Sequence, residues 1–336
     1  MPHSVLIQPG GQHFELADDT TILAGALDAG LTLPYGCRDG ACGSCKGRVL
    51  AGEVDHGRAS ITALSEDERA AGMALFCCAT ARSDVTIECH QVVSADDFPV
   101  KKLPCRVQRM EKLADDVMLI EVKLPATEQF RFRAGQYIDF LLAGNRRRSF
   151  SIANAPQDAT HLELHIRRVP DGTFTRHVFE TMKEKEILRF EGPLGSFYLR
   201  EAPDRPIILL AGGTGFAPIK GLVEYALKVG IERPMTLYWG SRNKAGLYMD
   251  QLARNWESEM PGFRYVPVLS DEAWGERTGL VHQAVMDDHP DLSGHQVYAC
   301  GAPAMIDAAR RDFASCGLPD DQFFADAFTY ASDPAP

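Results

Sequence analysis

Long apolar runs and an excess of basic residues are missing from this chain of 336 residues. The longest apolar stretch, Ile207–Ala211, is far too short to span a bilayer. Residues Met1–Ser4 carry no basic segment followed by an apolar one, so we expect no secretory signal and a soluble, cytoplasmic protein. The formal net charge of −11 argues against nucleic acid or an anionic membrane as the main partner.

Internal repeats and low-complexity tracts are absent too, and 45% hydrophobic with 24% charged residues is typical of a globular protein. Two polar, proline-bearing stretches, Ser94–Pro99 and Glu201–Pro206, separate segments of different charge and periodicity. We therefore expect three domains, residues 1–97, 98–203 and 204–336, whose net charges are −8, +4 and −7. The positive middle domain suits a dinucleotide pyrophosphate, unless its charge only reflects solvated faces.

Each segment has its own hydrophobic periodicity. The first joins short alternating runs to an apolar helix-like stretch at 22–29, and Ser65–Glu68 fits a capping box, which together predict a small α+β domain. Period-two runs in the second predict an antiparallel barrel, and strand-helix alternation in the third predicts a doubly wound parallel sheet. The expected strands of these two segments are 119–124, 137–141, 162–169, 188–190, 207–210, 236–239, 264–269 and 296–300, and the expected helices are 219–228, 249–256, 280–286 and 304–314.

Three of the nine cysteines fall within nine residues. In a reducing compartment such a group indicates a metal site or catalysis before disulfides. Cys37, Cys42 and Cys45 have the C-x4-C-x2-C spacing of a plant-type two-iron, two-sulfur (2Fe-2S) cluster, whose fourth thiolate comes from a distant segment. Either Cys77 or Cys78 can supply that thiolate.

The residues around the cysteines bear on which metal is bound. Gly36, Gly40 and Gly43 permit the tight wrapping that four thiolates around a small inorganic core require. Zinc is the alternative, but zinc sites favour a second short cysteine pair, which this chain lacks. A Rieske centre needs histidine ligands, and none occupies a ligand position. A plant-type cluster has a potential near about −400 mV, so we expect a low-potential, one-electron donor.

Two further motifs indicate phosphate binding. Arg148–Ser151 follows a predicted strand, and a guanidinium fork there matches two pyrophosphate oxygens at once, although an arginine run is often only a solvated face. Gly212–Pro218 lies between a predicted buried strand and a helix, where backbone N–H groups and the helix N-terminus can receive phosphate. A tight strand-to-helix turn without a ligand would have the same pattern.

These motifs carry a resemblance. Residues 1–97 resemble a plant-type ferredoxin, which has a β-grasp fold, and matching Leu75–Ala79 to the family's ligand segment places the fourth ligand at Cys77. Residues 98–203 resemble the FAD-binding barrel of the ferredoxin-NADP reductase superfamily, whose R-x-[YF]-S motif corresponds to Arg148–Ser151. The resemblance implies that Arg148 and Ser149 belong to the FAD pyrophosphate site, Phe150 packs on the flavin and Ser151 hydrogen-bonds near flavin N5.

Further segments resemble the same superfamily. A second phosphate-contacting turn contains Gly172, Thr173 and Thr175, with Asp171-Gly172 standing where relatives often have two glycines. The GGTG-x-AP and C-G-x-P-x-M motifs imply a nicotinamide site that contains Gly212, Gly213, Thr214, Gly215, Cys300 and Gly301. Phe328 is similar to an aromatic residue that lies beside the flavin and yields to nicotinamide. Gly240–Lys244 offers cations without an acid, so NADPH stays open, but relatives with this domain order mostly use NADH.

The domain order indicates which reductase this is. It is shared by CDP-6-deoxy-Δ3,4-glucoseen reductase, which serves a pyridoxamine-phosphate (PMP) dependent dehydrase in 3,6-dideoxysugar synthesis, and by reductases of multicomponent oxygenases. Segments such as Ser151–Pro156 and Thr278–Val285 look most similar to the sugar-pathway family. We expect hydride transfer from NADH to FAD, with Ser151, Cys300 and Phe328 as catalytic residues, and single-electron transfer through the cluster to the dehydrase. An oxygenase reductase, a sensor or carrier, and a simple flavin reductase are the alternatives.

Overall fold

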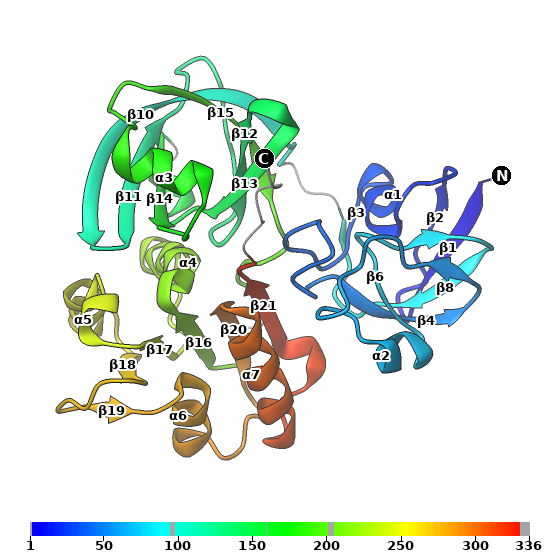
Figure 1. Ribbon diagram of the computed structural model, residues 1–336. Helices are drawn as coiled ribbons and strands as arrows, with labels where there is room; N and C mark the ends of the chain where they lie inside the picture. Colours follow the sequence, from blue (N-terminus) through cyan, green and yellow to red (C-terminus); the bar gives the residue numbers. More distant parts are fainter. Residues whose placement is uncertain (1, 95–97, 159, 201–204, 330–336) are drawn as a thin grey trace. The chain divides into compact units, whose positions relative to one another are not determined.

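The computed structural model describes residues 2–94, 98–158, 160–200 and 205–329, which form two compact units (Figure 1). The first unit is Met1–Phe98 with Gly195–Phe197, and the second is Pro99–Leu194 with Tyr198–Pro336. The domain limits expected at 97/98 and 203/204 touch residues 95–97 and 201–204, which lie outside the described residues. No helix within the described ranges is long and apolar enough to cross a membrane.

The first unit is built on a five-stranded sheet in the order β2-β1-β8-β4-β6. Strands β1 and β8 are parallel and the other pairs are antiparallel. Helix α1 begins after Thr21, whose hydroxyl accepts a hydrogen bond from the Ala24 N–H, and the capping box expected at Ser65–Glu68 is confirmed. The elements are β1 (His3–Gln8), β2 (His13–Leu16), α1 (Ile22–Asp28), β3 (Leu31–Thr32), β4 (Lys46–Ala51), β5 (Val54–Asp55), α2 (Glu66–Ala70), β6 (Met73–Leu75), β7 (Thr80–Ala81), β8 (Val85–Glu88) and β9 (Val93–Ser94).

The second unit begins with the predicted antiparallel barrel, whose strands lie in the order β13-β12-β15-β10-β11-β14. A bridge between Ile152 and Leu164 joins the two end strands, so the sheet closes on itself. Phe140, Phe190 and the α3 residue Phe174 fill its core. The elements are β10 (Lys101–Ala114), β11 (Val117–Lys123), β12 (Tyr137–Leu142), β13 (Arg146–Ser151), β14 (His161–Arg167), α3 (Thr173–Glu180) and β15 (Ile187–Leu194), with 3-10 turns η1 (Ala143–Asn145) and η2 (Pro156–Asp158).

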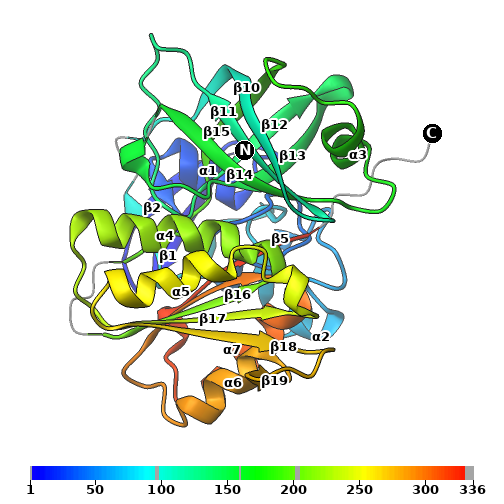
Figure 2. The same ribbon diagram turned by 90° about the vertical axis from the view of Figure 1, so that its left-hand side faces the viewer.

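The same unit ends in the predicted parallel sheet, in the order β19-β18-β17-β16-β20-β21. Helices α4 and α5 lie on one face of this sheet, and α6 and α7 lie on the other (Figure 2). The strand order reverses between β16 and β20, which is where ligands bind in sheets of this kind. The elements are β16 (Ile207–Gly212), η3 (Gly213–Gly215), α4 (Phe216–Val229), β17 (Met235–Ser241), η4 (Lys244–Gly246), α5 (Asp250–Glu259), β18 (Phe263–Leu269), β19 (Arg277–Thr278), α6 (Val281–Asp288), β20 (Gln296–Gly301), α7 (Pro303–Ser315), η5 (Asp320–Gln322) and β21 (Phe323–Ala327).

The structure confirms the strand expected before the arginine run and adds elements to the sequence-based interpretation. The arginine run follows β12, as predicted, and itself forms a further strand, β13, which pairs with β12 along its whole length. Consecutive charges hid this strand because its edge residues are exposed on one side. Strand β10 was missed because polar residues and Pro104 interrupt its apolar alternation, and α3 and β21 are too short for a clear period.

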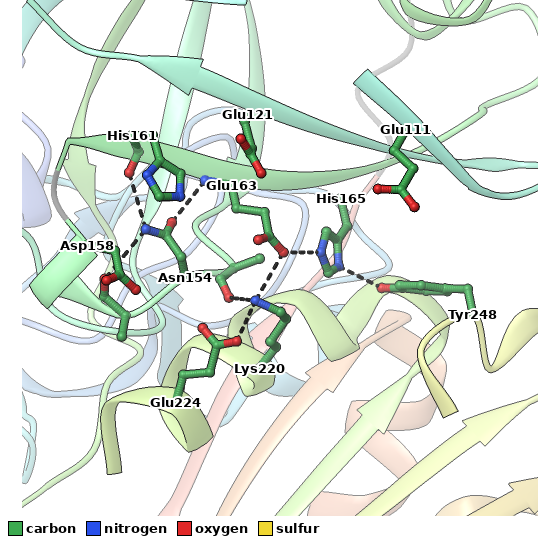
Figure 3. Close-up of polar contacts among 12 residues, drawn as sticks. Glu111, Glu121, Asn154, Asp158, His161, Glu163, His165, Lys220, Glu224 and Tyr248 are labelled. Atoms are coloured by element: carbon green, nitrogen blue, oxygen red, sulfur yellow. Dashed lines mark hydrogen bonds and ion pairs between the residues drawn. The ribbon is translucent and has the colours of Figure 1, made fainter. Parts of the chain in front are cut away.

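A buried polar network joins the barrel to α4 (Figure 3). The Lys220 Nζ donates to the carbonyl of Ala153 at 3.2 Å and lies 3.1 Å from Glu163 Oε1 and 2.7 Å from Glu224 Oε1. Only 6% of the Lys220 side chain is exposed, and three acceptors match the three N–H bonds of an ammonium group. A buried charge is tolerated under such conditions because its hydrogen bonds replace those of water.

His165 extends this network. Its Nε2 lies 2.8 Å from Glu163 Oε1, and its Nδ1 lies 3.1 Å from the Tyr248 hydroxyl. Since a carboxylate only accepts, Nε2 carries the proton and Nδ1 accepts from Tyr248. Burial lowers the pKa of His165. Burial alone would raise the pKa of Glu163, but the hydrogen bond from His165 and the charge of Lys220 lower it to about 2.

We expect the second unit to lose stability as the pH falls from 7 to 5. An unfolded histidine takes up a proton below about pH 6.5, whereas folded His165 resists protonation. An unfolded glutamate takes one up near 4.5, whereas folded Glu163 does so only near 2. At these two residues the unfolded state therefore binds more protons throughout this range, and the contribution of His165 is at most about 2 kcal/mol at pH 5.

Urea unfolding followed by the fluorescence of the three tryptophans, Trp239, Trp256 and Trp274, which all belong to this unit, measures the effect. The variant His165→Gln should show a shallower decline in unfolding free energy between pH 7 and 5 than the unmodified protein. Equal slopes for the two proteins would contradict the assignment of this pH dependence to His165.

Candidate functional site

The cysteine loop folds around its own sulfur atoms. The Cys37 N–H donates to Cys42 Sγ at 3.4 Å, and the Asp39 N–H donates to Cys37 Sγ at 3.3 Å. Gly40 has φ +75°, and a Cβ there would lie 2.6 Å from Cys78 Sγ, so this position requires glycine. N–H groups directed at sulfur stabilise the negative charge of a bound iron-sulfur cluster.

The four expected ligands are brought together as two pairs. A hydrogen bond from Cys42 lowers the pKa of Cys37 to about 6, and a hydrogen bond with Cys45 is the largest cause that raises the pKa of Cys77 to about 12. Among the described residues, no three His, Cys, Asp or Glu side chains converge on one ion. Two thiol pairs fit a two-iron cluster, since each iron takes two protein ligands.

Cys78 occupies a different place from Cys77. Its Sγ lies 3.7 Å from Cys77 Sγ, and its other polar neighbour is the Arg58 guanidinium. The thiol packs against Gly40 behind the loop, whereas Cys77 lies beside Cys45. The two candidates for the fourth ligand therefore differ: Cys77 approaches the thiol of the expected ligand Cys45, whereas Cys78 approaches the thiol of Cys77.

The expected FAD motif lies on β13, opposite β12 in the barrel. The Phe150 ring is 5.9 Å from Phe140 and 5.6 Å from Phe174 of α3. This aromatic cluster brings the R-x-F-S motif next to the turn that starts α3. Ser151, at the end of β13, is 7% exposed. The two segments expected to contact FAD are thus neighbours in space.

Alternation along β13 separates the three arginines. Arg147 forms ion pairs with Glu191 and Asp139, and the Ser149 hydroxyl donates to Asp139 Oδ1 at 2.6 Å. Arg148 lies on the other face of the strand, the face of Phe150. Its Nη1 donates to the Arg147 carbonyl at 2.8 Å. Of the run, Arg146 and Arg148 therefore share the face of the aromatic cluster, and Arg148 is the one nearer to Phe150 in the strand.

The second expected phosphate turn precedes α3. Asp171 has φ +58°, a conformation that glycine adopts most easily and aspartate tolerates, which accounts for an aspartate where relatives have glycine. The Thr175 hydroxyl is bonded within the turn, to Val169 and to the Gly172 carbonyl at 3.2 Å. This hydroxyl holds the shape of the turn, and the helix N-terminus after Gly172 provides a positive electrostatic end.

The three expected nicotinamide segments meet at the carboxyl ends of adjacent strands. In the parallel register, Ala211 of β16 lies beside Cys300 of β20, and Gly301 lies beside Ala327 of β21. The Phe328 N–H then donates to the Gly301 carbonyl at 2.8 Å. A Cβ on Gly215 would lie 2.0 Å from the Cys300 carbonyl oxygen, so only glycine lets the turn approach β20 this closely.

A cavity of about 1400 Å³ opens at these strand ends. It is large enough for a dinucleotide, which binds in this position in doubly wound sheets. Burial raises the pKa of Cys300, so its thiol is neutral near this cavity. The residues expected from the sequence that line it are Gly212, Gly213, Thr214, Gly301 and Phe328, and Arg167, Arg242 and Asn243 line it too.

Sequence reasoning missed the residues that support the glycine turn. Phe216 stacks on Trp239 with ring centroids 3.8 Å apart, and Trp239 Nε1 donates to the Gly213 carbonyl at 3.0 Å. Arg167 of β14 lies within 3.3 Å of the Cβ position of Gly213. Trp239 ends a predicted strand beside the glycine motif, which was an available signal. The approach of Arg167 comes from another part of the fold and leaves no trace in local sequence.

Three family models match the chain in the expected order. A 2Fe-2S iron-sulfur cluster binding domain matches residues 5–82, an oxidoreductase FAD-binding domain matches 104–198, and an oxidoreductase NAD-binding domain matches 209–311. The predicted cofactors, a 2Fe-2S cluster, FAD and a nicotinamide dinucleotide, are thereby confirmed, as is the predicted fold class.

Similar proteins extend over almost the whole chain. The CDP-6-deoxy-L-threo-D-glycero-4-hexulose-3-dehydrase reductase of Yersinia pestis is 42% identical over 98% of this chain and 99% of its own length. The reductase component DmpP of phenol 2-monooxygenase from a Pseudomonas species is 36% identical over 100% of this chain and 97% of its own length.

A solved structure agrees with these matches. The Amycolatopsis cytochrome P450 reductase GcoB is 35% identical, with a TM-score of 0.79 over 98% of this chain and 100% of that one. The protein is accordingly an electron-transfer oxidoreductase that uses a nicotinamide dinucleotide, FAD and a 2Fe-2S cluster. It belongs to the CDP-6-deoxyhexulose-3-dehydrase reductase family, within the ferredoxin-NADP reductase superfamily.

Proposed function

We propose that this protein passes electrons from NADH to a PMP-dependent CDP-6-deoxyhexulose 3-dehydrase of 3,6-dideoxysugar synthesis. The observation that carries the proposal is the 42% identity to a reductase named for that dehydrase, over 98% of this chain. The match includes the ferredoxin-like end, from which electrons leave in this scheme. NADH is proposed as the donor on the resemblance to reductases with this domain order.

The cluster ligands in this proposal are Cys37, Cys42, Cys45 and Cys77. The two thiol pairs and the backbone N–H groups directed at sulfur support this choice. Cys77 is chosen over Cys78 because it lies beside Cys45, whereas the Cys78 thiol approaches Cys77, Arg58 and Gly40. All nine cysteines are free, which supports work in the reducing cytoplasm.

The residues proposed for FAD come from the barrel. Arg148 and Ser149 belong to the pyrophosphate site, Phe150 packs on the flavin, and Ser151 offers a hydroxyl near flavin N5. The turn formed by Gly172, Thr173 and Thr175 receives the second phosphate contact, through its backbone and the N-terminus of α3. The aromatic cluster that joins β13 to α3 supports placing one cofactor across both segments.

The residues proposed for nicotinamide binding lie at the carboxyl ends of the adjacent strands β16, β20 and β21. Gly212, Gly213, Thr214 and Gly215 present backbone to the dinucleotide, while Cys300 and Gly301 lie beside the nicotinamide ring and Phe328 yields to it. When bound, the flavin takes a two-electron hydride and releases electrons singly, so the protein's part is to bind and orient the reactants. We also propose domain limits at 1–97, 98–203 and 204–336.

A second acceptor is favoured by a specific observation. The phenol 2-monooxygenase reductase component is 36% identical over the full length of this chain, so an oxygenase component is the alternative partner. The sites for FAD and nicotinamide would be the same in both cases. The two hypotheses differ in what the ferredoxin-like unit meets.

We expect Cys77→Ala to abolish cluster assembly, because one iron then lacks a thiolate, and Cys78→Ala to retain the cluster. Both thiols are buried, with 6% and 4% exposure, so the second variant is a matched control for loss of a buried sulfur. Iron content and the visible spectrum after anaerobic reconstitution report the cluster. NADH-to-ferricyanide activity should persist in both variants, since it needs only the flavin. A full iron content in Cys77→Ala, with loss in Cys78→Ala, would reverse the assignment.

The partner is tested by reconstitution with purified components under anaerobic conditions. NADH oxidation should depend on both the dehydrase and its CDP-6-deoxyhexulose substrate, and Cys77→Ala should reduce it to background. A phenol hydroxylase oxygenase component should support much slower turnover. Faster transfer to the oxygenase component than to the dehydrase would overturn the dehydrase proposal in favour of the alternative.

A further inference from the structure

The amino group of Lys220 is bonded to the segment that follows β13, the strand of the expected flavin motif. Its Nζ donates to the carbonyl of Ala153, two residues beyond Ser151, and forms an ion pair with Glu163 of β14. Ala153 and Glu163 are themselves joined, because the Ala153 N–H donates to the Glu163 carbonyl at 2.8 Å. Lys220 thus bonds both to the segment after β13 and to β14.

The helix that carries Lys220 starts at the nicotinamide site. Helix α4 begins at Phe216, directly after the glycine turn, so Lys220 lies about one turn into the helix. Glu224, one further turn along α4, provides its third acceptor. A displacement of Lys220 along the helix axis would displace the glycine turn with it.

The backbone of α4 is in close contact with the backbone of the segment after Ser151, so there is little room for either to shift. A Cβ on Gly221, the residue after Lys220, would lie 3.0 Å from the Ile152 carbonyl oxygen. Helix α4 is therefore pressed against the residues that follow Ser151. At the start of α4, Gly215 of the glycine turn contacts the Cys300 backbone. Helix α4 therefore connects the two sites: Gly221 contacts Ile152, the residue after Ser151, and Gly215 contacts Cys300.

A second connection runs in parallel through His165. Its Nε2 donates to the same Glu163 oxygen that faces Lys220, and its Nδ1 accepts from Tyr248. Tyr248 follows η4, whose residues Ala245 and Gly246 line the cavity. The carboxylate of Glu163 is thus the common acceptor for Lys220 of α4 and for His165 (Figure 3). Through His165 and Tyr248 it is linked to the segment after η4, and the η4 residues form a second wall of the nicotinamide cavity.

We propose that Lys220 is a positioning residue for hydride transfer: its bonds to Ala153 and Glu163 set the separation between the Ser151 end of the flavin strand and the Cys300 end of the nicotinamide site. The inference rests on the proposed roles of Ser151 and Cys300. An apolar side chain of similar volume fills the same space, but it leaves the carboxylates of Glu163 and Glu224 without their ammonium partner, so a loss of stability is expected as well. It also lacks the three directional bonds of the Lys220 ammonium group.

The test compares Lys220→Met with Lys228→Met. Lys228 lies two turns further along α4 and pairs with Asp158 of the barrel at the surface, so its variant removes an exposed ion pair between the same two parts. Both proteins are loaded with FAD, and stopped-flow absorbance follows flavin reduction by NADH without any partner.

We expect the limiting rate of flavin reduction to fall by about 10- to 100-fold in Lys220→Met, because a misplacement of about 1 Å has effects of this size. The NADH concentration for half-maximal rate and the FAD content should stay within about twofold, and the deuterium isotope effect with 4-deuterated NADH should rise. Lys228→Met should match the unmodified protein. If Lys220 had a purely structural role, Lys220→Met would change the stability of the protein, but it would not lower the limiting rate while leaving the NADH affinity unchanged.

Glu163→Gln provides the second variant, because it keeps the shape of the acceptor and removes its charge. A slower limiting rate at full FAD content in this variant supports the proposal even where Lys220→Met does not fold. Unchanged limiting rates in FAD-loaded Lys220→Met and Glu163→Gln would overturn it, whatever their melting temperatures. Failure of the unmodified protein's flavin to be reduced by NADH would instead refute the proposed function, since that readout does not depend on Lys220.

Discussion

The arrangement of the second unit depends on how helix α4 is held against the segment after β13, and the buried ammonium group of Lys220 on α4 bonds to that segment. Lys220 has three acceptors and is almost fully enclosed, so its desolvation is offset only in one arrangement of the barrel and the helix. Hydride transfer requires reacting atoms roughly 3 to 3.5 Å apart. Apolar contact alone tolerates sliding, whereas directional bonds from a charged group do not. The charge is therefore placed where geometry matters most for the chemistry.

The cysteine loop differs from this network because its geometry is set mainly by contacts within the loop itself. Its thiols are held by their own backbone: N–H groups of Cys37 and Asp39 point at sulfur, and Gly40 admits the close approach of Cys78. The proposed fourth ligand, Cys77, comes from a distant segment, after β6. A centre that transfers single electrons needs a fixed ligand set and a low-reorganisation environment more than it needs a closing cavity. This is why a short loop suffices there and three strand ends are required for nicotinamide.

The same contrast explains what could be predicted from the sequence. The spacing of Cys37, Cys42 and Cys45 is a local pattern that one chemistry requires, and it identified the cluster before any fold was known. Buried parallel strands such as β16 and β20 were predicted because apolar runs between glycines have few other interpretations. Strand β13 was missed because its charges oppose strand propensity, and only pairing with β12 overrides that preference.

The remainder could not be predicted, because it depends on pairs distant in sequence. Glu163 and His165 look like ordinary polar positions of a barrel strand, and Lys220 looks like a surface lysine of an amphipathic helix. Their burial follows only once β14 faces α4, a contact between residues more than 50 positions apart. A single lysine in a helix carries no local signal of burial, since its propensity is the same in either place. Sequence motifs therefore indicate the residues proposed for flavin and nicotinamide, while the buried contacts of Lys220 emerge only from the packing of one part of the unit on another.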